Sequence, residues 1–495
     1  MTIRLIADGR GPLRHRILQK LVAQSNGQIE LVCHLGDRDS DFQAACLQRM
    51  EVRRGRKGHL MNAHIARGAE LPLLASSEYY WMLEQGIEQL HRCGPSYRYR
   101  AHNLNHIQDY LDYYHILADA YAQQIEESEA THALFLNMPH LGYDIILYHV
   151  ARVMGLKTLI CSQTFFADSF FSMECIDDFG YLSPNGRDNA PMAIEKGSTP
   201  AAANTSLIFN DERWQKTGPR GRLKLQTVFS FVRYLAAKDP IKLFNFPYIF
   251  RNLRRIAAIY TSLPDWRDPF AKFFHVNELA YFEHLAQHEQ HSCDLDVPFV
   301  YIPLHNQPEM STQTLGGKFR DQLLIVEAIA RILPVGWRIY VKENPRQTAY
   351  ARGPMFFHRL SRIQGVQLVP SETSTYELSS RAQVTATVCG TAGYEALRKG
   401  KPVIIFGGAW YGDFPGVFRW NEGLDLAAIA ATKFQHHDLE IAMGCLQGRC
   451  HPGVIELLYN QQSTGLDGEA NADAVAKTIH KLLTGKSSLS FKRAE

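Results

Sequence analysis

The C-terminal half of the chain alternates short apolar runs with helical patterns, and this alternation constrains the fold more than any other feature. The apolar runs predict strands at Pro298–Leu304, Trp337–Lys342, Val366–Val369, Val384–Val388 and Pro402–Phe406. Helical spacing of apolar residues lies between them, at Asp321–Leu333, Met355–Ile363, Thr375–Arg381 and Ala392–Lys399. Buried strands that alternate with helices form a parallel sheet covered by helices, so this half predicts a Rossmann-like domain.

The N-terminal half shows the same alternation less regularly. Strands are expected at Ile3–Ala7, Gln28–Cys33, His132–Asn137 and Lys157–Cys161, and helices at Leu13–Ala23 and Tyr143–Met154. The predicted fold class is therefore α/β, with two Rossmann-like domains in a GT-B arrangement and an inserted, mostly helical middle segment. The expected limits are 1–205, 206–290 and 291–485.

The middle segment differs from both halves in its charge. Residues 213–255 contain eleven Lys or Arg, one acid and eight aromatic residues, a net charge of +10. The rest of the chain has 42 basic and 49 acidic residues, so the overall charge of +3 conceals an acidic body with one basic segment. Three interpretations stay open: an interfacial helix on anionic lipid, a groove for an acidic acceptor, or ordinary packing.

Composition excludes several classes of protein. With 45% hydrophobic residues the chain is not disordered, and a net charge of +3 does not indicate a nucleic-acid partner. Nine cysteines without a CxxC pair predict neither a disulfide framework nor a zinc site. The N-terminus does not resemble a signal peptide, and no apolar run is long enough to span a bilayer. We expect a cytoplasmic protein, and peripheral association with the inner membrane stays open.

Two strand exits of the C-terminal half contain residues suited to a phosphate. Lys342, Asn344 and Pro345 follow the second strand, where Lys342 supplies a point charge and Pro345 stiffens the loop. An ordinary strand exit with solvated charges is the alternative.

The fourth strand leads into Gly390, Thr391, Ala392 and Gly393, at the start of a helix. Amide groups at a helix start bind anions, and Glu395 could accept hydrogen bonds from ribose hydroxyls. Glu395 could equally serve only to stabilise the helix dipole.

Further candidates lie at neighbouring strand ends. Tyr411, in a glycine-rich turn after the fifth strand, could stack on a base or sugar, or simply pack against the domain. His305 ends the first strand and should face the cleft between the domains, although a lone histidine is more often structural.

The N-terminal half supplies candidates for a general base. His140 and Asp144 follow a strand and are four residues apart, so they can share a helical face or cap the helix. Asp8 follows the first strand and is an equal candidate. The loop after Asp8 is only a partial dinucleotide fingerprint, because Arg14 stands where its third glycine would be.

Together the C-terminal motifs resemble the capsular polysaccharide biosynthesis proteins, which include the β-Kdo transferases of capsule export. The motifs are Lys342-Glu343-Asn344-Pro345, Cys389 to Leu397, Gly400-Lys401-Pro402-Val403 and Gly407 to Tyr411. The resemblance covers roughly residues 295 to 420, is looser at Pro139-His140 and is absent from the basic segment.

The resemblance implies a metal-independent GT-B glycosyltransferase without a cofactor, whose donor is a nucleotide sugar, often a CMP-activated keto-sugar acid such as Kdo or a nonulosonate. Its acceptor would be a glycan or lipid-linked glycan. This chain departs from the family at Asn344, where members have a histidine that contacts the donor phosphate. Asparagine can hydrogen-bond a phosphate but cannot be protonated, so UDP and GDP donors stay open. Two other functions also remain: a nucleotide-sugar epimerase, and a non-catalytic partner in a polysaccharide assembly complex.

Overall fold

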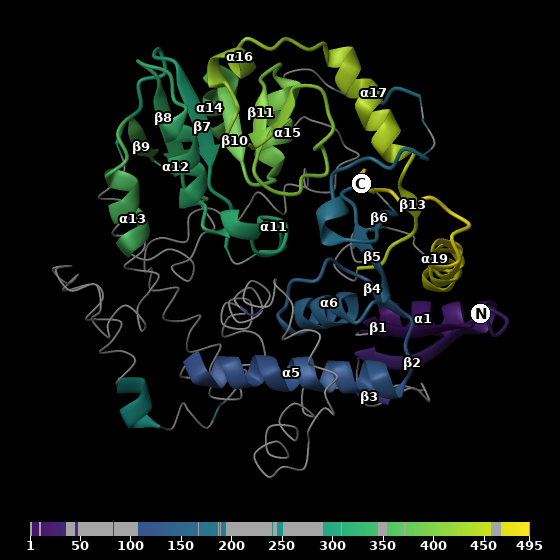
Figure 1. The fold of residues 1–495 in the computed structure, drawn as a ribbon. Helices are drawn as coiled ribbons and strands as arrows, with labels where there is room; N and C mark the ends of the chain where they lie inside the picture. Colours follow the sequence, from purple (N-terminus) through teal and green to yellow (C-terminus); the bar gives the residue numbers. More distant parts are fainter. Residues whose placement is uncertain are drawn as a thin grey trace.

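The computed structural model contains two β-sheets, each with helices on its faces (Figure 1). It describes residues 2–8, 11–35, 45–47, 83, 107–166, 168–186, 188, 190–194, 240, 245–250, 291–307, 309–344, 354–370, 373–456 and 467–494. Both sheets are mostly parallel, so the predicted α/β class with two Rossmann-like domains is confirmed. Most of the basic segment 213–255 lies outside the described residues.

The second sheet has six parallel strands in the order β12-β11-β10-β7-β8-β9. Its strands are β7 (Phe299–Pro303), β8 (Arg338–Lys342), β9 (Val366–Val369), β10 (Val384–Thr387), β11 (Val403–Ile405) and β12 (Val417–Arg419). In chain order this is 6-5-4-1-2-3, the Rossmann order. The order reverses between β7 and β10, and ligands bind at the carboxyl ends of the strands at such a switch point.

The helices of this domain follow the predicted pattern closely. They are α11 (Met310–Gln313), the 3-10 turn η5 (Gly317–Arg320), α12 (Leu323–Arg331), α13 (Pro354–Ser361), α14 (Thr375–Arg381), α15 (Thr391–Arg398), α16 (Leu426–Ala430) and α17 (His436–Gln447). Ser374 caps α14 by accepting a hydrogen bond from the amide of Glu377. The sequence prediction did not include α11, α16, α17 or the three-residue strand β12, which are mostly too short to show a period.

The first sheet has seven strands in the order β13-β6-β5-β4-β1-β2-β3. They are β1 (Ile3–Asp8), β2 (Ile29–Leu35), β3 (Ala45–Leu47), β4 (His132–Phe135), β5 (Lys157–Gln163), β6 (Ser169–Met173) and β13 (His451–Pro452). Strands β1 to β5 are parallel, whereas β6 pairs antiparallel with β5 and β13 antiparallel with β6. Helices α1 (Pro12–Gln24), α5 (Ile107–Glu127) and α6 (Tyr143–Val153) accompany it, with the 3-10 turn η2 (Ile176–Asp178).

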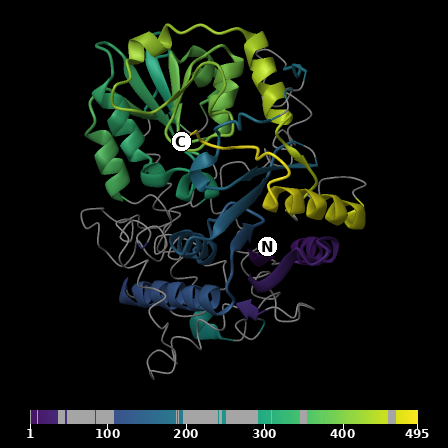
Figure 2. The same ribbon diagram turned by 45° about the vertical axis from the view of Figure 1, so that its right-hand side comes forward.

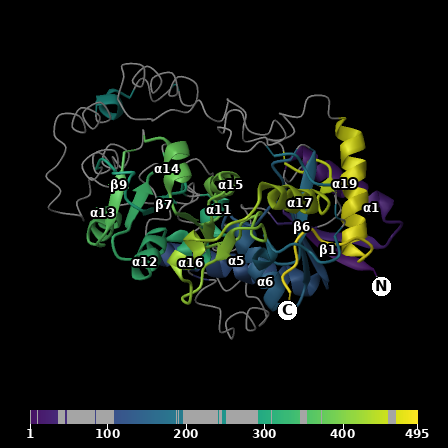
Figure 3. The same ribbon diagram turned by 90° about the horizontal axis from the view of Figure 1, so that it is seen from above.

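The last part of the chain returns to the first sheet. Strand β13 joins its edge, and α19 (Gly468–Leu483) packs beside α1, as Figures 2 and 3 show. The core of this region combines Ile17 and Leu21 of α1 with Val475 and Ile479 of α19. The predicted limits 1–205, 206–290 and 291–485 assigned this stretch to the second domain, but its packing places it on the first.

The two domains contact each other through the loops that follow their strands. The rings of Phe165 and Trp410, from different domains, have centroids 4.2 Å apart. The guanidinium of Arg419 lies 3.6 Å from the ring centroid of Tyr181 and donates to the carbonyl oxygen of Gly180 at 2.7 Å. One continuous apolar core therefore includes buried residues of both domains.

Asn471 offers a test of how the C-terminal helix is attached. Its side chain donates to the carbonyl of Val454 at 2.9 Å and accepts from the Val454 amide at 2.8 Å, in a buried setting. We expect Asn471→Ala to lower the free energy of unfolding by about 1–3 kcal/mol, because two buried backbone groups lose their partner. Urea unfolding and hydrogen exchange of the Val454 amide measure this.

Thr478→Ala is the matched control for Asn471→Ala. Thr478 lies on the same helix and its exposed hydroxyl bonds only one turn back, to the carbonyl of Ala474. The control should unfold like the parent chain. Unchanged Val454 exchange in Asn471→Ala would contradict the assignment.

Candidate functional site

The carboxyl ends of β7, β8 and β10 lie at one level of the second sheet. Pro303 pairs with Lys342, and Thr385 pairs with Tyr301 two residues earlier in β7. His305, Lys342 and Gly390 therefore leave the sheet side by side, at the point where the strand order reverses.

His305 is held tightly at this switch point. Its ring Nε2 lies 2.8 Å from the hydroxyl of Thr387, the last residue of β10. The side chain of Gln322 accepts from the His305 amide at 2.7 Å and donates to its carbonyl oxygen at 3.1 Å. Through the bond to Thr387, His305 connects the ends of the two central strands. The residue is only 9% exposed, so it presents little surface.

Lys342 belongs to a buried polar group beside α14. Its ammonium donates to the hydroxyl of Thr375 at 2.8 Å, and only 7% of the residue is exposed. Tyr301 also hydrogen-bonds Thr375 through its side chain, and burial raises the pKa of Tyr301. Thr375 thus connects the ends of β7 and β8 to the first residue of α14.

Asn344 lies at the start of the loop after β8. Its backbone amide donates to a carboxylate oxygen of Glu343 at 2.6 Å, and the Glu343 side chain is almost fully buried. This bond turns the chain immediately after the strand. Pro345, the next predicted residue, lies outside the described residues.

Helix α15 begins where the sequence predicted an anion site. Gly390 is its N-cap, Thr391 its exposed first residue and Ala392 its partly exposed second residue. The first amide groups of a helix have no partner within it, so they suit a phosphate.

The two glycines of this turn are required for packing within the protein. A Cβ on Gly390 would lie 2.8 Å from Cε1 of His305, and one on Gly393 would lie 2.2 Å from the hydroxyl of Tyr411. Tyr411 is fully buried and donates to the carbonyl of Gly390 at 2.5 Å. We therefore expect Tyr411 to support the Gly390 turn rather than to stack on a ligand.

Glu395 lies one turn into α15. Burial raises its pKa, and the nearby cations of Lys399 and Arg398 oppose that shift. Lys399 donates to Ser379 at 2.6 Å, and burial lowers its pKa to about 8. Glu395 also acts electrostatically on Tyr301, whose side chain hydrogen-bonds Thr375.

On the other domain, the side chain of Asp144, at the start of α6, binds the backbone of the loop that contains His140. The carboxylate of Asp144 accepts from the amides of His140 at 3.0 Å and Leu141 at 2.6 Å, and is 3% exposed. The ring Nδ1 of His140 lies 2.7 Å from the carbonyl of Met138. A proton on Nδ1 leaves Nε2 of a neutral imidazole as an acceptor, the form that a general base needs.

Asp8 has a different environment. Its carboxylate lies 3.1 Å from the guanidinium of Arg14, and both side chains are largely buried. Arg14 is the residue that replaces the third glycine of the dinucleotide fingerprint, so the departure noted in the sequence provides the partner of Asp8.

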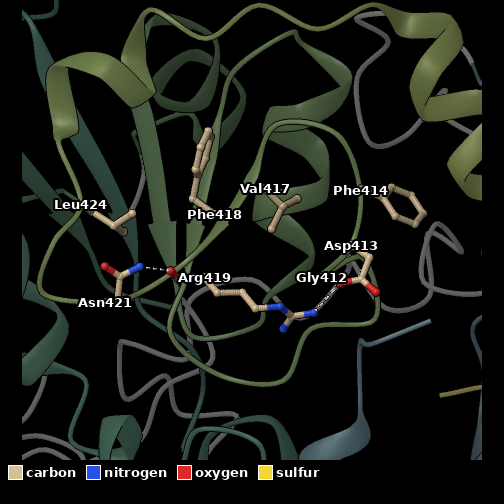
Figure 4. Close-up of a pocket in the computed structure, with 8 residues that line it drawn as sticks. All are labelled: Gly412, Asp413, Phe414, Val417, Phe418, Arg419, Asn421 and Leu424. Atoms are coloured by element: carbon tan, nitrogen blue, oxygen red, sulfur yellow. Dashed lines mark hydrogen bonds and ion pairs between the residues drawn. The ribbon is translucent and has the colours of Figure 1, made fainter. Parts of the chain in front are cut away.

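A pocket with a volume of about 460 Å³ lies at the outer edge of the second sheet (Figure 4). Its lining residues are Gly412, Asp413, Phe414, Val417, Phe418, Arg419, Asn421 and Leu424. Arg419 donates to Asp413 at 2.9 Å across it. None of the predicted site residues lines this pocket, which lies beside β12 and not at the β7–β10 switch point.

Within the part of the chain that the structure describes, no group of three or more His, Cys, Asp or Glu could hold a metal ion. Seven cysteines of the described part are free thiols: Cys33, Cys161, Cys175, Cys293, Cys389, Cys445 and Cys450. No described helix has the length and apolarity to cross a membrane.

Residues 289–436 match the family model described as Capsule polysaccharide biosynthesis protein. This confirms the resemblance predicted from the motifs between 295 and 420. The matched stretch contains β7 to β12 and α11 to α16, so it includes His305, Lys342, Gly390 and Glu395. A comparison with curated protein sequences gives no match.

Several solved structures are similar to the chain at low identity. KpsC β-Kdo 2,7 transferase from Thermosulfurimonas dismutans is 13% identical over 73% of this chain and 88% of that one, with a TM-score of 0.31. The β-Kdo 2,4 transferase of the same protein is 15% identical over 63% and 79%, with a TM-score of 0.26. A UDP-GlcNAc 2-epimerase from Methanocaldococcus jannaschii is 9% identical over 98% and 100%, with a TM-score of 0.22.

Sequence reasoning missed the residues that hold the candidates in place. Gln322, Thr375 and Thr387 each bond a predicted site residue across at least 17 positions of sequence. Only the position of Thr375 and Thr387 at predicted element ends gave a signal, since polar residues there often face a site.

The close approach of Gly390 to His305 predicts the effect of one added methyl group. In Gly390→Ala the ring of His305 must move and lose its bond to Thr387, at a cost of about 1–3 kcal/mol in unfolding free energy. Urea unfolding and the NMR signals of the His305 ring report this. Gly423→Ala is the control, because its Cβ would meet only the side chain of Asn421, at 3.3 Å. Unmoved His305 signals in Gly390→Ala would refute the packing assignment.

Proposed function

We propose that this chain is a metal-independent glycosyltransferase of capsule or related surface polysaccharide synthesis, which moves a sugar from a nucleotide donor to a glycan acceptor. The observation that carries the proposal is the convergence of Lys342, Glu395 and the start of α15 at the β7–β10 switch point, within the stretch that matches the capsule family. A phosphate site at the carboxyl ends of a Rossmann sheet is what a nucleotide sugar requires.

The donor phosphate would bind between Lys342, Asn344 and the first amides of α15, at Gly390 to Gly393. When the nucleotide leaves, negative charge grows on its phosphate, and the Lys342 ammonium and the positive end of α15 stabilise that charge. The ammonium of Lys342 donates a hydrogen bond to the hydroxyl of Thr375, so the position of its charge is fixed before the donor binds. Glu395 would accept hydrogen bonds from the ribose hydroxyls.

The acceptor hydroxyl would be deprotonated by His140. Its Nε2 takes the proton while the acceptor oxygen forms a bond to the anomeric carbon and the bond from that carbon to the donor phosphate breaks, so the nucleotide departs with the electron pair. Asp144 holds the loop through two backbone amides. Asp8 is paired with Arg14, which favours His140 as the base.

A CMP-linked keto-sugar acid, such as Kdo or a nonulosonate, is the favoured donor, because that is the substrate class implied by the family resemblance. Asn344 stands in place of a histidine and cannot be protonated, so Lys342 and the N-terminus of α15 would neutralise the charge of the leaving phosphate. UDP and GDP donors are the alternatives that the experiment below separates.

We further propose that the basic segment brings the enzyme to an anionic membrane. Phe246 and Phe250, four residues apart on the short helix 246–250, are 74% and 68% exposed. Spacing of four places both rings on one face of a helix. Eleven basic residues in 213–255 would attract anionic headgroups while the two rings enter the interface.

The donor class is tested by thermal unfolding with CMP, UDP and GDP. A nucleotide that binds the folded state stabilises it by ~2.7 kcal/mol at a concentration about 100 times its Kd. We expect CMP to raise the melting temperature most. Lys342→Met and Glu395→Gln should abolish this shift and sugar transfer from a CMP-linked donor to a capsule oligosaccharide, measured by mass spectrometry.

Lys433→Met and Glu422→Gln are the matched controls, since both side chains are exposed and follow the edge strand β12 rather than the strands of the switch point. Full transfer by Lys342→Met and Glu395→Gln would refute the site assignment. An altered donor sugar produced without acceptor would indicate an epimerase instead of a transferase. Failure to bind any nucleotide would favour a non-catalytic assembly partner.

Membrane association is tested by flotation with phosphatidylglycerol vesicles at low and high salt. We expect salt-sensitive binding, reduced about tenfold or more in the double variant Phe246→Ser and Phe250→Ser, because each buried aromatic side chain contributes about 1.5–3 kcal/mol. Val335→Ser is the control, because Val335 is a fully exposed apolar residue of the second domain. Equal flotation of the double variant would exclude the two rings as anchors.

A further inference from the structure

A hydrogen bond between the two domains reaches the backbone beside the proposed base. The hydroxyl of Thr314 donates to the carbonyl oxygen of Pro139 at 2.6 Å. Thr314 is 5% exposed and ends the short helix α11 of the second domain, whereas Pro139 belongs to the first. A buried hydroxyl–carbonyl bond of this length fixes the position of the peptide that it contacts.

Pro139 directly precedes His140, so this bond acts on the loop that carries the base. Within the first domain, Nδ1 of His140 meets the carbonyl of Met138, and the amide of His140 meets Asp144. These two bonds fix the ring relative to its own loop. Thr314 fixes the loop relative to the second domain.

Thr314 is itself attached to the donor side of the site. The carbonyl of Leu315, the next residue, accepts from the amide of Gly408 at 2.9 Å. A Cβ on Gly407 would lie 2.3 Å from the same carbonyl, so the loop after β11 is pressed against it. The thiol of Cys389, which precedes the N-cap of α15, donates to the carbonyl of Ser311 at 3.2 Å. The segment 311–315 therefore rests on the loops that follow β10 and β11.

We propose that Thr314 is a positioning residue that aligns His140 with a donor bound on the opposite domain. This inference rests on the proposed transferase function. Without the hydroxyl, the Pro139 peptide loses its tie to the donor-side loops and Nε2 of His140 is no longer held against the acceptor. Misplacement of a base by less than 1 Å slows the chemical step without weakening donor binding.

The test compares Thr314→Val, which has the same shape without the hydroxyl, with Thr314→Ser, which keeps it. For sugar transfer we expect Thr314→Val to lower kcat about tenfold or more while KM for the donor and the affinity for free nucleotide change less than about twofold. Thr314→Ser should restore kcat to within about threefold of the parent enzyme. Thr432→Val makes the same change at a position whose hydroxyl bonds one turn back, to Ala428, and should behave like the parent.

An NMR measurement of the His140 ring separates this inference from the proposed function. Its signals should shift in Thr314→Val and remain in place in Thr314→Ser and Thr432→Val, whether or not transfer is observed. Unshifted His140 signals in a folded Thr314→Val protein would overturn the inference. Equal kcat in Thr314→Val and the parent enzyme, or equal losses in the valine and serine variants, would overturn it as well.

Discussion

The packing of Phe165 against Trp410 is the contact on which the arrangement of the site depends. It joins the apolar cores of the two domains at the loops after β5 and β11, and the loops after β4 and β7 meet through the bond between Thr314 and Pro139. Apolar burial is not directional, so this ring contact alone would allow the domains to rotate. The bond from Arg419 to the Gly180 carbonyl and its stacking on Tyr181 supply the missing direction.

Hydroxyl groups perform the finer positioning. Thr387 orients His305, Thr375 holds the ammonium of Lys342, and Thr314 reaches across to Pro139. Each is buried or partly buried, where an unpaired polar group costs about 1–3 kcal/mol, so each loop has one strongly preferred position. The two glycines contribute in a different way. Gly390 and Gly393 leave room for His305 and Tyr411, and their packing keeps the start of α15 in place.

Much of the fold could be predicted from the sequence. Strands β7 to β11 and helices α12 to α15 lie within two residues of the predicted ranges, because each buried strand is a short apolar run and each helix has an apolar face. The partly exposed edge strand β12 and the two-residue strand β13 form no buried apolar run, and they were missed, as was the antiparallel strand β6. The candidate residues at strand ends were identifiable for a topological reason, since parallel strands deliver their carboxyl ends to one edge.

The fold class, the family resemblance and the position of the polar residues at strand ends can be read from the amino-acid sequence, because these follow from local patterns a few residues long. What each of these residues does depends on the tertiary structure. It paired Asp8 with Arg14, used Asp144 to hold the amides of His140 and Leu141, and buried Tyr411 beneath Gly390. It also placed Thr314 beside Pro139, 175 positions away. Such partners are distant in the chain and are selected by the geometry of packing, which no local pattern contains.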